Sequence, residues 1–307
     1  MGRSWLLLLI PFLFATRKLV YETRRRRKIL HQSERVLVLG GSSGIGREIA
    51  RQYAARGAKV CIVGRTPEKL AEAVEECKGA ISAVADLSNV EDMIRLRNML
   101  ETDLGGIDTI IVAAGVSATR PLLSIADVDS PTANATQAGV ERAVTAASAA
   151  VQGNYIGPLV AAVTFIPLLK RTSSSPSILL ISSLGAVVPA PTRTIYGSTK
   201  SASLLLYQSL AIEHPSINFS FILPSTVQGD FRASAVDVDS TAKATSTWNS
   251  EGLKVADVAK RCVEVVDSGE KLVFLPSTMR LGHLLYWIWP SFVEKKAMKK
   301  YGFTTTG

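Results

Sequence analysis

Short apolar runs alternate with longer amphipathic stretches along most of this chain. Residues 35–39 (RVLVL) and 177–181 (SILLI) illustrate the runs. Continuous apolar runs of this length are typical of strands buried on both faces of a parallel sheet. The alternation therefore predicts an α/β fold. The predicted strands are 35–39, 58–63, 81–85, 109–112, 177–181, 217–223 and 271–275, and the predicted helices are 46–56, 67–78, 138–170, 192–212 and 255–266, with one more from about 89.

Two polar segments interrupt this pattern. Residues 116–137 and 229–252 are rich in Ser, Thr, Ala and Asp. We predict an irregular insertion for the first segment. We predict a flap over the substrate for the second, because long irregular segments inside a domain are usually functional.

The amino-terminal residues 5–15 (WLLLLIPFLFA) form an apolar run broken by Pro11. A spanning helix needs about 20 residues, so this run fits a signal peptide, an uncleaved anchor or an interfacial helix. The cleavage pattern is weak, since Leu13 stands where a small residue is preferred. The basic residues of 17–28 favour an anchor with the main domain in the cytosol. We therefore expect membrane association, at the endoplasmic reticulum or a lipid droplet.

The carboxyl-terminal residues 281–293 (LGHLLYWIWPSFV) are also apolar and aromatic, and lysines follow them. This combination is typical of a segment in the membrane interface. A helix packed on its own domain or on a second subunit is the alternative. The predicted divisions are an anchor at 1–33, a catalytic domain at 34–276 and an interfacial tail at 277–307.

Composition limits the classes of function. The formal charge is +9 and 47% of the residues are hydrophobic, but much of the positive charge lies in the amino-terminal segment. That distribution favours a membrane surface over nucleic acid. The cysteines Cys61, Cys77 and Cys262 are widely separated, and no metal-binding spacing is present, so we expect neither disulfides nor a metal centre.

A glycine-rich turn between the first strand and the first helix carries the strongest binding signal. Gly40, Gly44 and Gly46 allow a tight turn and let backbone N–H groups approach a pyrophosphate. In NAD sites an acid usually ends the second strand, whereas here Arg65 follows that strand and suits a 2′-phosphate, which favours NADP. Asp86 ends the third strand, where a carboxylate can bind the adenine amino group or cap the next helix.

Ser183, Tyr196 and Lys200 form the candidate catalytic set. Ser183 follows the predicted strand 177–181, and Tyr196 and Lys200 are four residues apart on one helix face. A tyrosine has a pKa near 10, and a nearby ammonium favours its ionised form. The serine hydroxyl could then hold a substrate carbonyl while the phenol exchanges a proton.

Together these motifs resemble those of the short-chain dehydrogenase/reductases across residues 34–275. The resemblance implies a Rossmann-type, three-layer, doubly wound sandwich with a seven-stranded parallel sheet. It implies that Tyr196 exchanges the proton, that Lys200 binds the nicotinamide ribose, that Ser183 orients the substrate and that Asn154 holds a water in a relay to Lys200. The expected cofactor-binding residues are Gly40, Ser42, Ser43, Gly44, Ile45, Gly46, Arg65, Asp86, Leu87, Ala114, Asn154, Tyr196, Lys200, Pro224 and Val227.

Several positions depart from that family's pattern. Ala113 stands where an asparagine is usual, Ser225 replaces a glycine, and Gly229 replaces a threonine that often binds the cofactor amide. None of these changes removes a catalytic group. The anchor, Arg65 and the apolar tail look like the membrane-associated branch that includes hydroxysteroid dehydrogenases and 3-ketodihydrosphingosine reductases.

The expected activity is NADPH-dependent reduction of a ketone, or oxidation of the matching alcohol, on a lipophilic substrate. The alternatives are oxidation of a small secondary-metabolite alcohol and a non-catalytic nucleotide-binding scaffold. The intact Ser183, Tyr196 and Lys200 argue against the scaffold. A homodimer is a further expectation.

Overall fold

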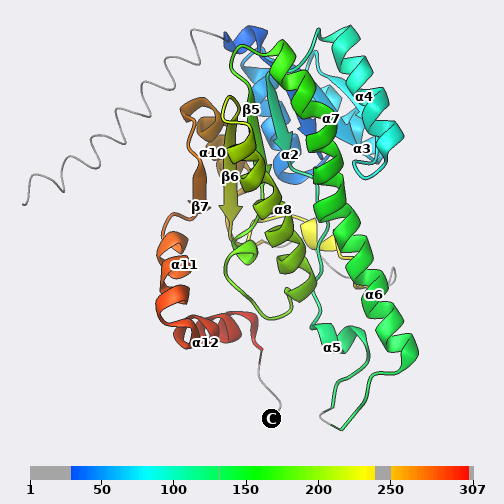
Figure 1. The fold of residues 1–307 in the computed structure, drawn as a ribbon, viewed down its shortest axis with the longest axis vertical. Helices are drawn as coiled ribbons and strands as arrows, with labels where there is room; N and C mark the ends of the chain where they lie inside the picture. The colour runs from blue at the N-terminus through cyan, green and yellow to red at the C-terminus, as the bar shows by residue number, and fades with distance from the viewer. Residues whose placement is uncertain (1–28, 131, 239–249, 304–307) are drawn as a thin grey trace, which may run out of the picture.

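The computed structural model describes residues 29–130, 132–238 and 250–303. The predicted anchor lies mainly outside the described residues, as does the middle of the predicted flap. The described part begins with a short 3-10 turn, η1 (His31–Ser33). A doubly wound α/β domain follows it (Figure 1).

Seven parallel strands form the sheet in the order β3-β2-β1-β4-β5-β6-β7. This order confirms the predicted Rossmann-type fold, and every predicted strand is present within two residues of its predicted bounds. The chain leaves β1 toward one edge of the sheet and returns to β4 toward the other. Ligands of such sheets bind at this reversal, beyond the carboxyl ends of the strands. The strands are β1 (Arg35–Leu39), β2 (Lys59–Gly64), β3 (Ile81–Val84), β4 (Thr109–Val112), β5 (Ser177–Ile181), β6 (Asn218–Pro224) and β7 (Leu272–Leu275).

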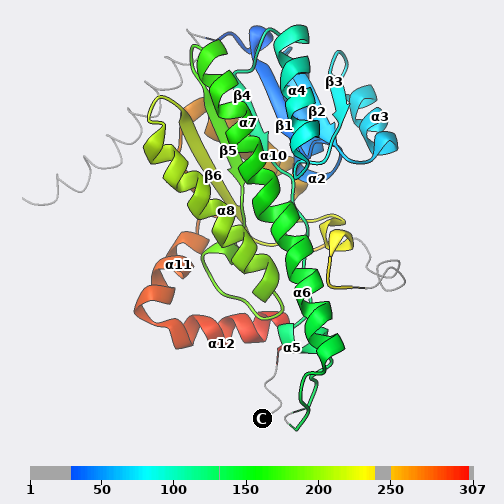
Figure 2. The ribbon, with the colours of Figure 1, turned by 45° about the vertical axis from the view of Figure 1, so that its right-hand side comes forward.

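Helices cover both faces of the sheet, which explains why the strands are apolar throughout. Alternate strand residues point to opposite faces. Thus Leu37 and Leu39 pack with one helical layer, and Val36 and Val38 pack with the other. Figure 2 shows the first layer in front of the sheet. That layer comprises α4 (Val90–Asp103), α7 (Gly157–Thr172) and α8 (Thr194–Glu213), and the opposite layer comprises α2 (Gly44–Ala55), α3 (Pro67–Glu76) and α10 (Val255–Ser268).

The predicted helix 138–170 is continuous, but it contains a π turn. The stretch consists of α6 (Gln137–Val151), η2 (Gln152–Ile156) and α7, and Asn154 lies in the π turn. Among the described residues this is also the one helix long and apolar enough to cross a membrane, although 56% of its most apolar window is buried inside the domain. Such burial is typical of a core helix. The preceding insertion is irregular as predicted, except for the short helix α5 (Leu122–Ile125).

The carboxyl-terminal segment folds into two helices at the carboxyl ends of the strands. They are α11 (Met279–Ile288) and α12 (Pro290–Tyr301), and Pro290 begins the second helix. In both views α12 runs below the sheet toward the start of α8 (Figures 1 and 2). The tail therefore packs on its own domain along one side. Its other side leaves large apolar residues exposed, including Trp287 (75%) and Ile288 (81%).

Candidate active site

A cavity of about 560 Å³ opens at the carboxyl edge of the sheet. The glycine turn after β1 lines one part of it. The segment after β5, the start of α8 and one side of α12 line another. All the predicted catalytic and cofactor-binding residues line this cavity except Asn154, which lies buried behind the wall.

The glycine turn is shaped by two close backbone approaches. A Cβ on Gly46 would lie 2.2 Å from the Gly40 carbonyl oxygen, and a Cβ on Gly40 would lie 2.6 Å from Ala114 Cα. Neither position can carry a side chain without moving the backbone. Ser43 precedes α2 and makes no side-chain capping bond to it. The first N–H groups of α2 therefore remain available for an anion at the positive end of the helix.

Arg65 and Asp86 lie together at the same part of the cavity. The Asp86 carboxylate accepts hydrogen bonds from the Ser88 amide at 2.8 Å and the Ser88 hydroxyl at 2.7 Å. Burial acts to raise the pKa of Asp86, but the Ser88 bonds and the positive charge of Arg65 lower it below its usual range. This part of the cavity thus holds one carboxylate fixed by hydrogen bonds and one arginine near it.

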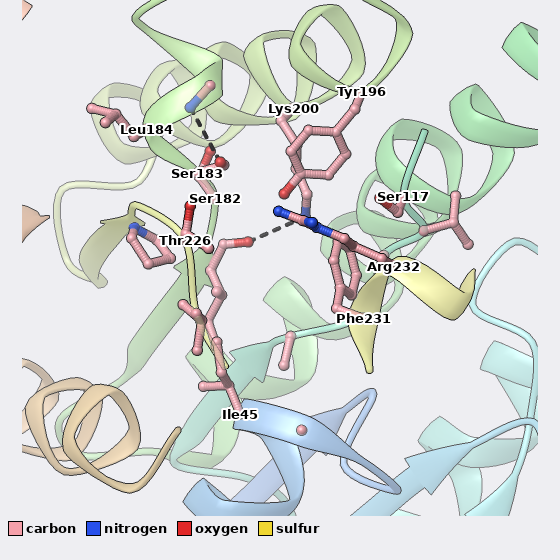
Figure 3. Close-up of a pocket in the computed structure, with 18 of the residues that line it drawn as sticks. Ile45, Ser117, Ser182, Ser183, Leu184, Tyr196, Lys200, Thr226, Phe231 and Arg232 are labelled. Carbon is pink, nitrogen blue, oxygen red and sulfur yellow. Dashed lines mark hydrogen bonds between the residues drawn. The ribbon is translucent and has the colours of Figure 1, made fainter. Parts of the chain in front are cut away.

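Ser183 and Tyr196 meet beside Gly185. Ser183 begins the 3-10 turn η3 (Leu184–Ala186), and its Oγ accepts a hydrogen bond from the Gly185 amide at 3.1 Å. A Cβ on Gly185 would lie 3.6 Å from Ser183 Oγ and 4.0 Å from Tyr196 Cε1. A Cβ on Gly197 would lie 2.8 Å from the Gly185 carbonyl oxygen, so this second glycine lets α8 approach the turn closely. Figure 3 shows Ser183 and Tyr196 at the same part of the pocket.

The pKa of Tyr196 differs from the sequence-based expectation. Burial raises the pKa of its phenol, while the Ser183 hydroxyl and the charge of Arg193 act in the opposite direction. We expected Lys200 to lower this pKa. Instead, Lys200 is buried, and its Nζ donates a hydrogen bond to the Ile181 carbonyl at 3.3 Å (Figure 3). Burial lowers the pKa of Lys200 itself to about 8.

Asn154 is fully buried, and its side-chain amide bonds to the protein at both ends. Its Oδ1 accepts a hydrogen bond from the Val116 amide at 2.8 Å, and its Nδ2 donates to the Val116 carbonyl and to Thr199 Oγ1, both at 3.0 Å. Both amide hydrogens are thus engaged by the protein. The side chain positions the segment after β4, and the predicted water relay stays a prediction.

Sequence reasoning missed four residues of this site. Phe231 packs edge-on against Tyr196, with ring centroids 6.0 Å apart. Gly115 makes room for Asn154 and Lys200, and Arg193 and Tyr301 meet near Tyr196. The spacing of three residues before Tyr196 could have indicated Arg193, because such residues share a helix face. No sequence pattern connects Tyr301 with residues so far along the chain.

Comparison with known proteins places this fold in a family. Residues 34–239 match the model of the short chain dehydrogenase family. The chain is 26% identical over 296 residues to 11-beta-hydroxysteroid dehydrogenase-like 3 of Arabidopsis thaliana, covering 94% of this chain and 85% of the relative. It is 27% identical over 271 residues to dehydrogenase/reductase SDR family member 7B of Danio rerio, covering 84% and 81%.

Solved structures show the same fold. A short chain dehydrogenase/reductase from Burkholderia phymatum in complex with NAD superposes with a TM-score of 0.70 at 18% identity, covering 85% of this chain and 95% of that chain. An alcohol dehydrogenase from the archaeon Thermococcus sibiricus, complexed with 5-hydroxy-NADP, gives 0.63 at 20% identity, covering 78% and 95%. The family match covers two-thirds of the length of the chain. This chain therefore belongs to the short chain dehydrogenase family of oxidoreductases and resembles the hydroxysteroid dehydrogenases within it.

Proposed function

We propose that this protein is an NADP(H)-dependent reductase of a ketone on a lipophilic substrate. One observation carries the proposal. Ser183 and Tyr196 flank Gly185 in the same cavity whose opposite wall is the glycine turn. A proton donor and a carbonyl-binding hydroxyl thus share a cleft with a dinucleotide-binding turn.

The residues of the cavity fit a nicotinamide dinucleotide. The turn from Gly40 to Gly46 offers backbone N–H groups to the pyrophosphate, and a Cβ on Gly44 would meet no atom within 4 Å. Ser182 Oγ is buried in the lining and has no hydrogen-bond partner among the described residues. Arg65 provides the cation that a 2′-phosphate requires, which favours NADP over NAD. When bound as NADPH, this cofactor supplies the hydride.

Tyr196 is suited to donate the proton. Burial raises the pKa of the phenol, so the group is protonated at neutral pH. The Ser183 hydroxyl accepts from the Gly185 amide and keeps its own hydrogen for the substrate oxygen. As the carbonyl oxygen becomes an alkoxide, Ser183 holds it by a hydrogen bond and Tyr196 protonates it. The positive charge of Arg193 acts in favour of the tyrosinate that remains.

The rest of the cavity suits a lipophilic substrate. Apolar side chains line it from the segment after β5, from η4 (Phe231–Ser234) and from α12. The apolar lining includes Leu184, Val188, Pro189, Phe231 and Val293.

The exposed apolar side of α11 supports attachment to a membrane, where such substrates dissolve. We propose that the catalytic domain faces the cytosol, at the endoplasmic reticulum or a lipid droplet.

We also propose a homodimer through α7 and α8. Both helices expose large apolar side chains, with Val163 at 70% and Leu205 at 65%. A shallow apolar cavity lies between them and includes Leu159 and Leu210. Sedimentation equilibrium of the wild type and of a Val163→Glu, Leu205→Glu variant tests this interface, and a monomeric wild type would exclude it.

Substitution of Tyr196 by phenylalanine tests the function. Purified protein is assayed with NADPH and a panel of keto-lipids. We expect kcat/KM to fall by about a hundredfold or more, because the proton donor is lost. The dissociation constant for NADPH should change by less than about threefold, because phenylalanine preserves the ring packing. Equal rates for the variant and the wild type would exclude Tyr196 as the proton donor, and nucleotide binding without turnover of any ketone or alcohol would favour a scaffold.

A further inference from the structure

The substrate side of the cavity carries an excess of positive charge. Arg193, Arg232, Lys296 and Lys300 line it, against the single carboxylate of Asp230 among the lining residues of this part. None of the four cations forms a salt bridge among the residues that the structure describes. Arg193 is half-buried, whereas Arg232, Lys296 and Lys300 are exposed to solvent. Charge-assisted hydrogen bonds from such groups to an anionic ligand are stronger than hydrogen bonds between neutral groups.

Arg193 is the most firmly placed of the four. It precedes α8 directly and is half-buried. Its guanidinium donates hydrogen bonds to the Ala118 carbonyl at 3.0 Å and to Ser117 Oγ at 3.4 Å, and Cζ lies 5.9 Å from the centre of the Tyr301 ring. These contacts fix the side chain but do not neutralise it. The charge of Arg193 acts on the Tyr196 phenol, so it lies close to the group that protonates the substrate.

The lysines belong to one face of α12. Val293, Lys296, Ala297, Lys300 and Tyr301 line the cavity, and their spacing of three and four residues defines a single side of a helix. This face combines apolar and cationic groups. The helix therefore offers both a surface for a hydrocarbon and charges for an acid.

Two further lysines of α12 provide an internal comparison. Lys295 and Lys299 are exposed like Lys296 and Lys300, yet they do not line the cavity. A general attraction of the tail to anionic lipid would use all four lysines. A ligand in the cavity would use only Lys296 and Lys300.

We propose that the substrate is an amphiphile whose acidic group, a carboxylate or a phosphate, binds Arg193 and the two cavity-lining lysines of α12. This inference rests on the proposed function and specifies its substrate class. Arg65 and the glycine turn lie at the nucleotide part of the cavity, so the phosphates of the cofactor do not account for these cations. The acidic group binds near the carbonyl, and the apolar body lies against Val188, Pro189 and Val293.

Ligand binding tests the proposal independently of turnover. Full-length protein in nanodiscs of zwitterionic lipid is saturated with NADP⁺ and titrated calorimetrically with octanoate, octyl phosphate and 1-octanol, with empty nanodiscs subtracted. We expect at least one acid to bind about tenfold or more tightly than octanol, as charge-assisted hydrogen bonds predict. The acid that binds more tightly distinguishes a carboxylate from a phosphate.

The variants locate the effect. Arg193→Gln should abolish the preference for acid, and Arg193→Lys should retain part of it. The Lys296→Gln, Lys300→Gln pair should reduce the preference about threefold or more, whereas the control pair Lys295→Gln, Lys299→Gln should leave it unchanged. The proposal is overturned if neither acid binds more tightly than octanol, and also if none of the three compounds binds. It is likewise overturned if the two lysine pairs change the preference for acid equally. Tyr196→Phe should keep the acid preference, so failure of this inference is distinguishable from failure of the proposed reaction.

Discussion

Asn154 holds the backbone of Val116 through both ends of its side-chain amide. Oδ1 accepts from the Val116 N–H at 2.8 Å and Nδ2 donates to the Val116 carbonyl at 3.0 Å. The π turn at Gln152–Ile156 places this asparagine next to the segment that follows β4. That segment also lines the cavity, so the irregular helix and the cavity wall form one unit.

Replacing Asn154 by alanine should destabilise the protein by about 3 kcal/mol. The change leaves the N–H and the carbonyl of buried Val116 without partners, and each unpaired group costs about 1–3 kcal/mol. Urea unfolding followed by circular dichroism measures the loss. Thr199→Val is the control, because it removes one of the three bonds and should cost about 1 kcal/mol. A loss below 1 kcal/mol in the alanine variant would show that the pairing contributes little.

Gly115→Ala should disturb the cavity wall that contains Lys200. A Cβ there would lie 2.8 Å from Asn154 Oδ1 and 3.0 Å from Lys200 Nζ. Crowding of this kind in a packed interior costs about 1–3 kcal/mol, and we expect kcat to fall with it. Gly282→Ala is the matched control, since nothing lies within 4 Å of the added methyl group. Equal stability and activity for the two alanine variants would be the contrary result.

Lys200→Met should stabilise the cofactor-free protein at pH 7. Burial lowers the pKa of Lys200 from its usual 10.5 to about 8. The folded state therefore carries this charge at pH 7 at a cost of about 3 kcal/mol. Loss of the bond to the Ile181 carbonyl offsets about 1 kcal/mol, which leaves a net gain of about 2 kcal/mol.

The sign of the pH dependence follows from the depressed pKa. Between pH 8 and pH 10.5 the unfolded chain retains the lysine proton while the folded chain has lost it. The free energy of unfolding of the wild type thus rises with pH across this window relative to that of the variant. The advantage of Lys200→Met should be complete below pH 8 and small near pH 10. Urea unfolding of both proteins at pH 7 and pH 10 without nucleotide measures this advantage. A difference in free energy of unfolding between variant and wild type that did not change with pH would disprove the lowered pKa of Lys200.

Arg65→Asp should reverse the cofactor preference. The change removes the cation beside the expected 2′-phosphate and adds a repulsive charge. We expect the dissociation constant for NADP⁺ to rise about tenfold or more and that for NAD⁺ to stay constant or fall. Lys69→Asp on α3 is the control, because Lys69 is exposed and does not line the cavity. Unchanged NADP⁺ affinity in Arg65→Asp, measured by fluorescence titration, would contradict the prediction.

The exposed side of the tail should bind lipid. Trp287, Ile288 and Trp289 are 75%, 81% and 57% exposed. Replacing all three by serine should weaken partitioning into vesicles about tenfold or more, because each large apolar side chain contributes about 1.5 kcal/mol or more when removed from water. Val84→Ser and Val90→Ser remove exposed apolar groups away from the tail and from the proposed dimer interface, and they serve as controls. Undiminished vesicle flotation of the triple variant would assign membrane attachment to the amino-terminal segment alone.

The sequence located the strands and the main chemical groups because the signals for them are local. The apolar run 35–39 followed by Gly40, Gly44 and Gly46 defines a strand, a turn and a helix start within a dozen residues. The spacing of Tyr196 and Lys200 fixes one helix face in the same way. The exposure of a side chain to solvent, in contrast, depends on contacts with segments that are remote in the sequence. The tail 281–293 reads as an interfacial segment, yet one side of α12 forms a wall of the cavity.

The sequence by itself determined the α/β class, the nucleotide-binding turn and the Ser183, Tyr196 and Lys200 set, because each depends on residues that are close along the chain. Only the tertiary structure decided the contact of Arg193 with Tyr301, the pairing of Asn154 with Val116 and the raised pKa of Tyr196. These depend on distances between remote segments and on burial. Both arise only when helices from opposite ends of the domain meet at the edge of the sheet.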